Sequence, residues 1–391
     1  MQLTIPLKTL RSMVDAVKEA IPKSPPQEVL NNFRLEAKNE LFTITATDLK
    51  LWLVRREDCD TIKQEGAIAL NAKRFSDMVK SLKGEEVSIN ASKGVALVKC
   101  GKSKFNLPVI DANNYPLMPK PSEGKTFAIA TDILHEGISA TLKTVSTDDT
   151  KPMIQGVHIH EFDETLEDED EPTHFLSFTA ADGSRGSVFK VVSPVLASLA
   201  VTIPTRTLKE VEHITQAETE VSLVNGHIWF NSRSLTIISP TIQQSYPPLR
   251  MMLAKMRKQE MSGSVKCDRK ELIESLKRVN TLSEGDIYEQ KVDMAIEGEE
   301  LKFFSEIAGV GNVEESMVCD VGTGSFRSLF NPKYLLLILD TTKSKYVKLE
   351  AYEGAQRCLF VSPCDGTDHE TYLMAKVEIK RFKPEEDDDE D

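Results

Sequence analysis

The sequence lacks the motifs that nucleotide-dependent and metal-dependent enzymes commonly share. No GxxxxGK[ST], GxGxxG or HExxH pattern occurs in its 391 residues. Neither a phosphate-binding loop nor a metalloprotease helix is therefore indicated. The glycine-containing segment VGTGSF at residues 321–326 is interpreted as a turn. We expect a protein that is not an enzyme and that needs no cofactor.

Paired cysteines and long apolar runs are also missing. The six cysteines stand at positions 59, 100, 267, 319, 358 and 364, with no CxxC spacing. This pattern predicts neither a disulfide framework nor a zinc site, and we expect reduced thiols. No apolar run approaches membrane-spanning length, and the N-terminus lacks the regions of a secretory signal. We therefore expect a cytoplasmic protein with no membrane partner.

The net charge of −13 comes from two acidic runs. Residues 161–171 carry eight acidic residues and no basic one, and residues 385–391 carry seven more. Without these fifteen residues the chain has a net charge of +2. Such runs usually lie in solvent, so we expect a loop at 161–171 and a disordered acidic tail at 380–391. The overall acidity does not exclude a nucleic-acid partner.

Two segments far apart in the sequence share one pattern. FTITATDLKLWLV at residues 42–54 and FLSFTAADGSRGSVF at residues 175–189 each alternate apolar and polar residues around a polar corner. This pattern is typical of two strands joined by a tight turn. Asp48 and Asp182 occupy the two corners, where a carboxylate commonly accepts hydrogen bonds from backbone amides. The recurrence suggests an internal repeat.

Each third of the chain is predicted to contain two amphipathic helices separated by strands. First helices begin near residues 8, 131 and 268, and second helices near residues 71, 205 and 331. Asn71 and Asn331 are expected N-caps, with Pro332 at the first helical position. The sequence therefore predicts three copies of one α+β unit. We expect domains at residues 1–122, 123–253 (with the acidic insert 161–171) and 254–379. The segment SYPPLRMML at residues 245–253 is expected to lead into a connecting region.

The predicted helices are more basic than the rest of the chain. The six helical segments together carry a net charge of +6, within a chain whose net charge is −13. Helices that face solvent commonly carry Lys and Arg, which is one explanation. If the helices share a surface, however, that surface could follow DNA phosphates without reading the sequence.

Three histidines were considered as metal ligands. His158 and His160 lie on one face of a predicted strand, and His174 is nearby in the sequence. No cysteine or carboxylate stands at ligand spacing from them outside the acidic run. We therefore expect no metal site.

Four segments carry a specific resemblance: LNNFRLEAKNELFTITATDLKLWL at 30–53, KSKFNLPVIDANNYPLMP at 102–119, FTAADGSRGSVFK at 178–190 and TYLMAKVEI at 371–379. Together with the three repeats, they resemble the bacterial replicative sliding clamp, the beta subunit of DNA polymerase III. The resemblance implies three domains of the DNA-clamp (processivity) fold, with helices inside and sheets outside. It also implies a head-to-tail homodimer that forms a six-domain ring around double-stranded DNA. The DNA polymerase and the clamp loader would then be partners.

The resemblance assigns roles to residues by position. Residues expected to contact DNA are Lys23, Lys73, Arg74, Lys80, Arg206, Lys209, Lys277 and Arg278. Residues expected to form a groove for short apolar partner peptides are Ile154, Ala181, Gly183, Ser184, Gly186, Pro247, Met251, Met252, Leu373, Ala375 and Val377. Residues expected at the dimer interface are Phe105, Thr281 and Leu282.

Three hypotheses about function remain at this point. The first is a replicative clamp that tethers the polymerase for processive synthesis. The second is a divergent clamp relative that serves a specialised polymerase or a mobile element, because several groove positions depart from the family pattern. The third is an enzyme on a repeated scaffold, which the missing motifs disfavour. The acidic tail or insert is expected either to lie free in solvent or to screen the groove.

Overall fold

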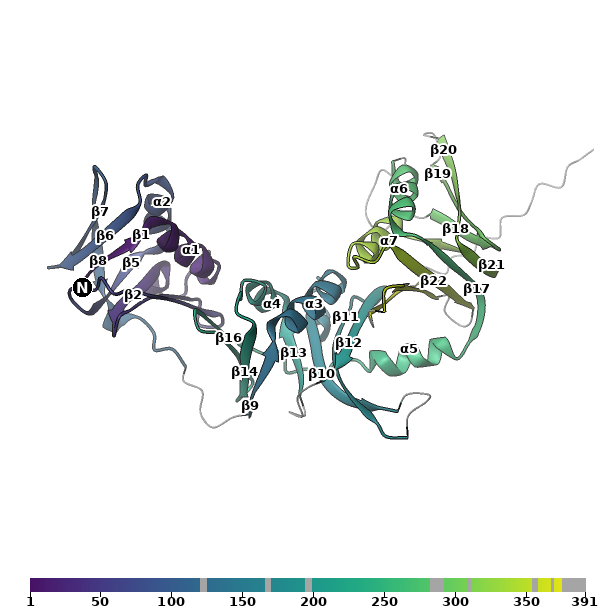
Figure 1. Ribbon diagram of the computed structural model, residues 1–391, viewed down its shortest axis with the longest axis horizontal. Helices are drawn as coiled ribbons and strands as arrows, with labels where there is room; N and C mark the ends of the chain where they lie inside the picture. Colours follow the sequence, from purple (N-terminus) through teal and green to yellow (C-terminus); the bar gives the residue numbers. More distant parts are fainter. Residues whose placement is uncertain are drawn as a thin grey trace, which may run out of the picture. The chain divides into compact units, whose positions relative to one another are not determined.

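The computed structural model describes residues 1–119, 125–165, 170–193, 199–281, 292–307, 311–353, 358–366 and 369–374 (Figure 1). The tail at 380–391 and the groove residues Ala375 and Val377 lie outside these ranges, as does Leu282. The chain forms two compact units, residues 1–138 with 193–243 and residues 139–192 with 244–391. Each unit is described separately.

The first unit contains one antiparallel sheet with helices packed against it. Its elements are β1 (Gln2–Pro6), α1 (Leu7–Val17), β2 (Asn32–Lys38), β3 (Leu41–Thr47), β4 (Trp52–Asp58), β5 (Gly66–Asn71), α2 (Ala72–Ser81), β6 (Glu86–Ser92), β7 (Val95–Cys100), β8 (Ser103–Asp111), β9 (Lys125–Ala130), β13 (Ala200–Pro204), α4 (Thr205–Val211), β14 (Glu218–Val224), β15 (His227–Asn231) and β16 (Leu235–Pro240). The strand order in this sheet is β1-β6-β7-β8-β5-β2-β3-β4-β16-β15-β14-β9. Short 3-10 helices occur at Lys18–Ala20 (η1), Glu28–Asn31 (η2) and Ala112–Asn114 (η3).

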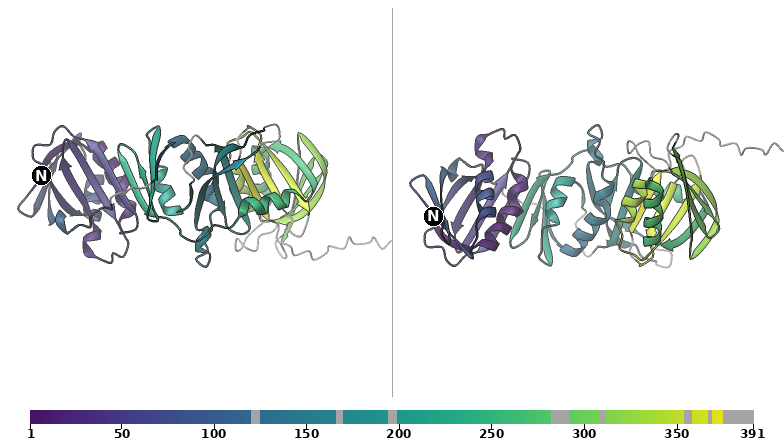
Figure 2. Two further views of the ribbon diagram at one scale, coloured as in Figure 1. Left: turned by 90° about the horizontal axis from the view of Figure 1, so that it is seen from below. Right: turned by 90° about the horizontal axis from the view of Figure 1, so that it is seen from above.

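The second unit is built in the same way. After α3 (Thr131–Thr141), which spans the boundary, come η4 (Leu142–Thr144), η5 (Pro152–Ile154), β10 (Gly156–Glu164), β11 (Thr173–Ala181), β12 (Arg185–Val192), α5 (Leu249–Arg257), β17 (Glu260–Asp268), α6 (Arg269–Asn280), β18 (Val292–Glu297), β19 (Glu300–Ile307), β20 (Gly311–Val318), β21 (Val321–Phe330), α7 (Pro332–Leu339), β22 (Tyr346–Glu353), β23 (Cys358–Pro363) and β24 (His369–Met374). Its strands follow the order β10-β11-β12-β24-β23-β22-β17-β21-β18-β19-β20. Figure 2 shows α1 beside α2 in the first unit and α6 beside α7 in the second.

Polar caps start the second helix of the first and third repeats, as predicted. The Asn71 side chain accepts a hydrogen bond from the Arg74 amide at the start of α2 (3.0 Å). Asn331 accepts one from the Lys333 amide at the start of α7, with Pro332 at the first helical position. Such caps satisfy amides that have no partner within the helix. The local sequence therefore sets where these helices begin.

The threefold repeat is visible in the backbone hydrogen bonds at the start of each first helix. The amide of Leu7 donates to the Glu85 carbonyl (2.7 Å) and that of Thr131 to Ala217 (2.9 Å). In the third repeat, the Arg269 amide donates to the Lys345 carbonyl (2.9 Å). Each bond ties the start of the first helix to the segment that follows the second helix.

A side chain on each first helix also binds the end of its partner helix. Arg11 on α1 donates to the carbonyls of Val79 and Leu82 at the end of α2 (3.2 and 2.5 Å). His135 on α3 lies 3.2 Å from the carbonyl of Val211, the last residue of α4. These carbonyls have no partner within the helix, and they carry its negative dipole end.

The third repeat uses a different position for the same contact. Arg269, the first residue of α6, donates to the Leu339 carbonyl at the end of α7 (3.0 Å) and to the Ser344 carbonyl beyond it (2.9 Å). The contact is kept in all three repeats although the residue and its place on the helix change.

The same two types of strand join successive repeats. Within the first unit, β4 of the first repeat pairs with β16 of the second, with Leu53 opposite Ile237. Within the second unit, β12 of the second repeat pairs with β24 of the third, with Ser187 opposite Thr371. By their order within a repeat, β8 corresponds to β16 and β24, and β20 corresponds to β4 and β12.

The two strands left over, β8 and β20, keep an unpaired edge. In the first unit, β8 pairs with β5 only at residues 109–111, and in the second unit β20 ends its sheet. Both strands are largely exposed, whereas β16 is buried over residues 235–239. Each end of the repeat array therefore carries an open strand edge of the kind that joins the repeats internally.

Three local predictions were wrong. The connection expected from residues 245–253 onward contains a helix, α5, since Leu249, Leu253 and Met256 make a buried helical stripe. Residues 161–164 were taken as loop but belong to β10, where Glu161 and Asp163 contact His174 and Glu164 pairs with Lys190. These partners compensate the acidic charge on the strand.

The third wrong prediction concerns the segment 321–326, which forms the first part of β21 and is not a turn. A side chain at Gly322 would overlap the backbone of Gly298, and one at Gly324 would overlap the Ser262 carbonyl. In this segment β21 pairs with β17 and then with β18. The glycines permit this close backbone approach.

Candidate DNA-contact surface and partner groove

Helix α2 carries three of the predicted DNA-contact residues on its exposed face. Lys73, Arg74 and Lys80 are exposed, whereas Phe75 and Val79 are buried against the sheet. The apolar stripe fixes which face of the helix is buried, and the basic residues therefore point to solvent. Lys23, between η1 and η2, and Lys209 on α4 are also exposed. These five residues have no ion pair within the described part of the chain.

The other three predicted DNA-contact residues are engaged within the chain. Arg206 on α4 forms an ion pair with Asp48 at the β3–β4 corner and donates to the Glu19 carbonyl (2.6 Å). Asp48 also accepts hydrogen bonds from the amides of Lys50 and Leu51 (2.9 and 2.7 Å), as expected of a corner carboxylate. Arg206 thus joins the second repeat to the first within the first unit.

The third repeat presents less free positive charge. On α6, Arg278 pairs with Glu315 of β20 (2.6 Å), and Lys277 pairs with Glu274 one turn earlier (3.0 Å). Hydrogen bonding to Glu315 raises the pKa of Arg278, and the same contact lowers the pKa of the carboxyl. Exposed pairs of this kind are weak, so DNA phosphates could compete for these cations. Helix α2 is the strongest candidate for the contact surface.

The predicted groove residues in the described part of the second unit gather around two elements. Ala181 and Gly186 face each other across the β11–β12 hairpin, and Arg185, next to Gly186, pairs with Leu373 of β24. Beside this hairpin, Ala181 packs into one buried cluster with Leu249, Leu253 and Met256 of α5.

The outer face of α5 carries the exposed groove residues. Met251 is 71% exposed and Met252 is 42% exposed. Ile154 on η5 is buried, and Pro247, just before the helix, is partly buried. Two flexible thioether side chains offer an adaptable apolar surface.

The β11–β12 corner is held by Asp182. Its carboxylate accepts hydrogen bonds from the amides of Ser184 and Arg185 (2.8 and 3.0 Å) and from the Arg185 side chain (2.9 Å). Gly183, at φ +97, adopts a backbone conformation that favours glycine. Ser184 is partly buried. The carboxylate therefore orders a corner with little side-chain bulk.

Sequence reasoning missed Arg185 and Tyr334 at this place. Arg185 is 9% exposed, and its guanidinium lies 4.1 Å from the ring centre of Tyr334 on α7. Its Nη1 atom is buried without a hydrogen-bond partner within the described residues. This donor therefore leaves one hydrogen bond of the guanidinium unsatisfied within the described residues. The only hint of Arg185 in the sequence was its place directly after the Asp182 corner.

His158 and His160 belong to an aromatic row, whereas His174 pairs with Glu161 and Asp163. His158 stacks on Tyr246 and on His160, with ring centres 4.9 and 5.0 Å apart, and His160 lies beside Phe162. Arg250 covers Phe162 at 3.5 Å. No group of three His, Cys, Asp or Glu within the described residues could hold a metal ion.

Acid should destabilise the second unit because of this row. Burial lowers the pKa of both His158 and His160 to about 4, with added repulsion from His160 on His158 and from Arg250 on His160. The unfolded chain binds these protons near pH 6.5, so the free energy of unfolding should fall between pH 6.5 and 4. Urea denaturation at several pH values measures this.

The double variant His158→Phe with His160→Phe is compared with the unchanged protein over the same pH range. It should lose most of this pH dependence. His174 acts in the opposite direction, since hydrogen bonding to Asp163 raises its pKa and its contribution is lost as pH rises. An unchanged acid slope in the double variant would contradict the assignment.

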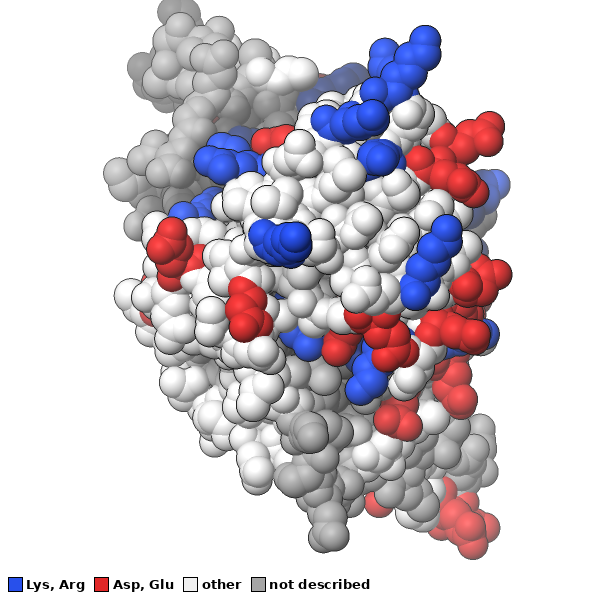
Figure 3. Space-filling model, turned by 90° about the vertical axis from the view of Figure 1, so that its left-hand side faces the viewer, with Lys and Arg blue, Asp and Glu red and all other residues white. Residues whose placement is uncertain are grey.

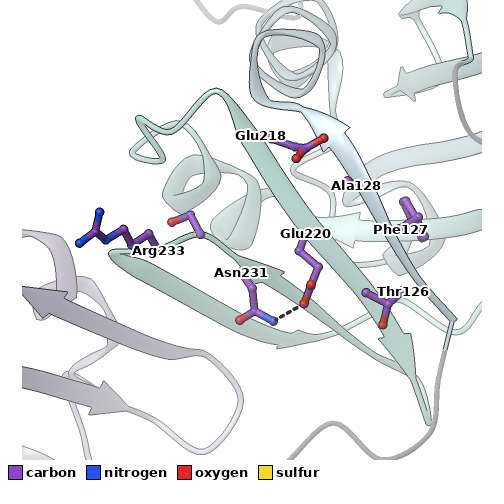
Figure 4. A pocket seen from close by; sticks show the side chains of 8 residues that line it. Thr126, Phe127, Ala128, Glu218, Glu220, Asn231 and Arg233 are labelled. Atoms are coloured by element: carbon purple, nitrogen blue, oxygen red, sulfur yellow. Dashed lines mark hydrogen bonds between the residues drawn. The ribbon is translucent and has the colours of Figure 1, made fainter. Parts of the chain in front are cut away.

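A shallow cavity in the first unit lies apart from all predicted sites. It has a volume of about 500 Å³ and is lined by Thr126, Phe127, Ala128, Glu218, Glu220, Asn231, Ser232 and Arg233. Figure 4 shows Asn231 and Glu220 joined by a hydrogen bond (3.5 Å) on neighbouring strands. Its lining contains no histidine or cysteine and none of the predicted site residues.

Two of the predicted dimer residues lie within the described ranges, Phe105 on β8 and Thr281 at the end of α6, which packs against β20. Phe105 on β8 is partly buried, and Thr281, at the end of α6, is exposed and donates to the Arg278 carbonyl (2.6 Å). Figure 3 shows the side of the molecule where β6, β7 and β8 lie. On this side Lys and Arg lie mainly in the upper part, and Asp and Glu lie mainly in the lower and right-hand parts.

Comparison with known proteins identifies the family. The DNA polymerase III beta subunit models match residues 1–119 (N-terminal domain), 128–248 (central domain) and 258–376 (C-terminal domain). Beta sliding clamps of Synechocystis and Bacillus subtilis are 27% and 26% identical to the chain. They align with 97% and 94% of it, and with 100% and 97% of their own lengths.

Solved structures agree on the fold. The Bacillus subtilis DNA polymerase sliding clamp superposes with a TM-score of 0.85 at 23% identity, covering 97% of this chain and 99% of that one. The Pseudomonas aeruginosa sliding clamp, bound to griselimycin, has a TM-score of 0.86 at 21% identity, with 97% and 100% covered. No described helix is long and apolar enough to cross a membrane. The chain belongs to the DNA polymerase III beta subunit family.

Proposed function

We propose that two copies of this chain close head to tail into a ring around double-stranded DNA and tether the replicative polymerase. The pairing of strands between repeats carries the proposal. At both junctions between repeats of one chain, a strand that corresponds to β4 pairs with a strand of the next repeat that corresponds to β8. These pairs are β4 with β16 and β12 with β24. Pairing β20 of one copy with β8 of the other continues the same rule and covers the open edges of these two strands. Three domains, at residues 1–122, 123–253 and 254–379, then contribute to each half.

A closed ring stays on DNA without tight binding. The exposed cations of α2 and Lys209 contact phosphates, and these contacts are sequence-independent and weakened by salt. Because topology provides the retention, weak contacts are compatible with sliding. The proposed role is positional, and it requires no catalytic group.

The topology of the DNA tests the proposal. Clamp loaded by a clamp loader should remain on nicked circular DNA and be lost when that DNA is cut to a linear form. Gel filtration of the protein–DNA complex before and after cutting measures this. Equal retention on both forms, or no retention on either, would rule out the ring.

Charge reversal on α2 should weaken the DNA contact. Lys73→Glu with Lys80→Glu replaces two exposed cations by anions, so the salt slope of DNA binding should fall by about 2. Retention on primed circular DNA should fall as well. Fluorescence anisotropy over a salt series measures the slope.

Two further variants make this test specific. Lys99→Glu with Lys102→Glu makes the same charge change at exposed sites outside the helices and should leave the slope unchanged. Glu315→Gln frees Arg278 from its ion pair and should raise DNA affinity. Equal effects of the α2 and β7–β8 reversals would contradict a specific role for α2.

The groove of the second unit is proposed to bind short apolar peptides of the polymerase and the clamp loader. Met251→Asp should weaken such a peptide at least about tenfold, since burying an apolar side chain contributes about 1.5–3 kcal/mol. Leu41→Asp, at an exposed apolar site of the first unit, is the matched control. Isothermal calorimetry with a polymerase C-terminal peptide measures the difference, and equal loss in both variants would place the peptide elsewhere.

A further inference from the structure

Arg250, the second residue of α5, lies on an aromatic ring beside the exposed groove residues. Its guanidinium is 3.5 Å from the ring centre of Phe162 on β10. Met251 and Met252 follow directly in the sequence, and both are exposed. The Arg250 side chain is itself 42% exposed. A cation that solvent can reach therefore stands next to the apolar surface proposed to bind partner peptides.

A row of rings holds this guanidinium in one orientation. His160 lies beside Phe162 with ring centres 5.5 Å apart, and Phe175 of β11 stacks on Phe162 at 5.6 Å. A guanidinium whose face covers a ring keeps its N–H donors at the edge of its plane, where a carboxylate can accept two of them. Because the row orders the cation in advance, less conformational entropy is lost when an anion binds.

Among the described residues, Arg250 has one carboxylate neighbour, Glu164 at the end of β10. Arg250 Nη2 and Glu164 Oε1 are 3.5 Å apart, which is long for a charge-assisted hydrogen bond. The other oxygen of Glu164 accepts from Lys190 Nζ at 2.9 Å. The remaining acidic side chains of β10, Glu161 and Asp163, lie on the opposite face of the strand because side chains alternate. Glu164 is thus held mainly by Lys190 and leaves donors of Arg250 unfilled.

The charge of α5 also favours an anionic partner. The helix carries Arg250, Lys255 and Arg257 and no acidic residue. Arg257 pairs with Glu350 (3.3 Å), whereas Lys255 is exposed. The exposed methionines of α5 therefore lie in a positively charged setting, which attracts a peptide that combines apolar residues with a carboxylate.

We propose that Arg250 binds a carboxylate of the partner peptide and so selects peptides that carry an acidic group beside their apolar residues. This inference rests on the proposed peptide groove and adds the property by which the groove discriminates among apolar peptides. The carboxylate belongs to an Asp or Glu side chain or to the C-terminus of the partner, since both present the same two oxygens. Met251 and Met252 contact the apolar residues, and the guanidinium donates to the carboxylate at their edge.

Peptide variants test the inference on the full-length protein. The probe is a synthetic polymerase C-terminal peptide in four forms, with Glu or Gln next to its apolar residues and with a free or an amidated C-terminus. Isothermal calorimetry should show that one carboxylate strengthens binding about fivefold, and that this preference weakens as salt is raised. Exchange of Glu for Gln reveals a side-chain source of the carboxylate, and amidation reveals a C-terminal source.

Substitutions at position 250 assign the preference to this residue. Arg250→Gln should lower the affinity of the preferred form to that of the form without a carboxylate, whereas a merely structural role would weaken all four forms alike. Arg250→Lys should keep only part of the preference, because an ammonium group cannot bind a carboxylate through two parallel hydrogen bonds. Lys343→Gln removes an exposed cation elsewhere in the second unit and should keep the full preference.

The outcomes separate this inference from the groove itself. Equal affinity of the unchanged protein for all four forms, or a preference that survives in Arg250→Gln, would overturn the role of Arg250 while the groove proposal stands. Failure of all four forms to bind would overturn the groove proposal and this inference with it.

Discussion

Replacing Phe105 by arginine should convert the protein from a dimer to a monomer at micromolar concentration. Phe105 stands two residues after the start of β8, as Ile237 does in β16, and Ile237 is fully buried where β16 pairs with β4. Burial of a large apolar side chain contributes about 1.5–3 kcal/mol, and a ring contains two such interfaces. The dimer dissociation constant should rise about 100-fold or more. Sedimentation equilibrium measures it.

A matched change on the same strand controls for damage to β8. Asn106 is exposed next to Phe105, with its side chain on the other face of the strand. Asn106→Arg adds the same charge and should leave the dimer nearly unchanged. If both variants dissociate equally, or neither does, β8 is not the strand that closes the ring.

Replacing Gly324 by alanine should strongly destabilise the third repeat. Gly324 has φ +70, and a Cβ atom there would overlap the Ser262 carbonyl oxygen on β17. Both the strained backbone and the overlap disfavour the folded state. We expect the free energy of unfolding to fall by about 4 kcal/mol, or folding of the repeat to fail. Denaturant unfolding followed by circular dichroism measures the loss.

Gly298 separates the two causes. It has φ +61, but a Cβ atom there would meet nothing within 4 Å. Gly298→Ala therefore includes only the backbone cost, about 1–2 kcal/mol. Equal losses in the two variants would show that the close approach of β21 to β17 has no energetic importance.

Features that depend on nearby residues could be predicted from the sequence. The caps Asn71 and Asn331 act within three residues of themselves, and the structure confirms both. The corner role of Asp48 and Asp182 is also confirmed, because the amides they bind lie two and three residues later. Apolar periodicity located the helices for the same reason.

Features that depend on distant residues could not be predicted in this way. Arg206 was expected on the DNA surface, yet it pairs with Asp48, which is 158 residues away. Cys267 and Cys319 have no recognisable spacing in the sequence, yet both belong to the buried core of the third repeat. Helix α5 was not predicted, although its stripe of Leu249, Leu253 and Met256 can be read from the sequence.

The strand pairings between repeats also determine where a ring would open. The β4–β16 and β12–β24 junctions join parts of one chain, so a broken junction reforms at the millimolar effective concentration typical of short tethers. The β20–β8 junction between copies has no covalent tether, and its closure depends on protein concentration or on the second closed interface. Dilution, or a loader that pulls on one subunit, would therefore separate β20 from β8 before any other junction. A loading factor need hold open only one β20–β8 interface.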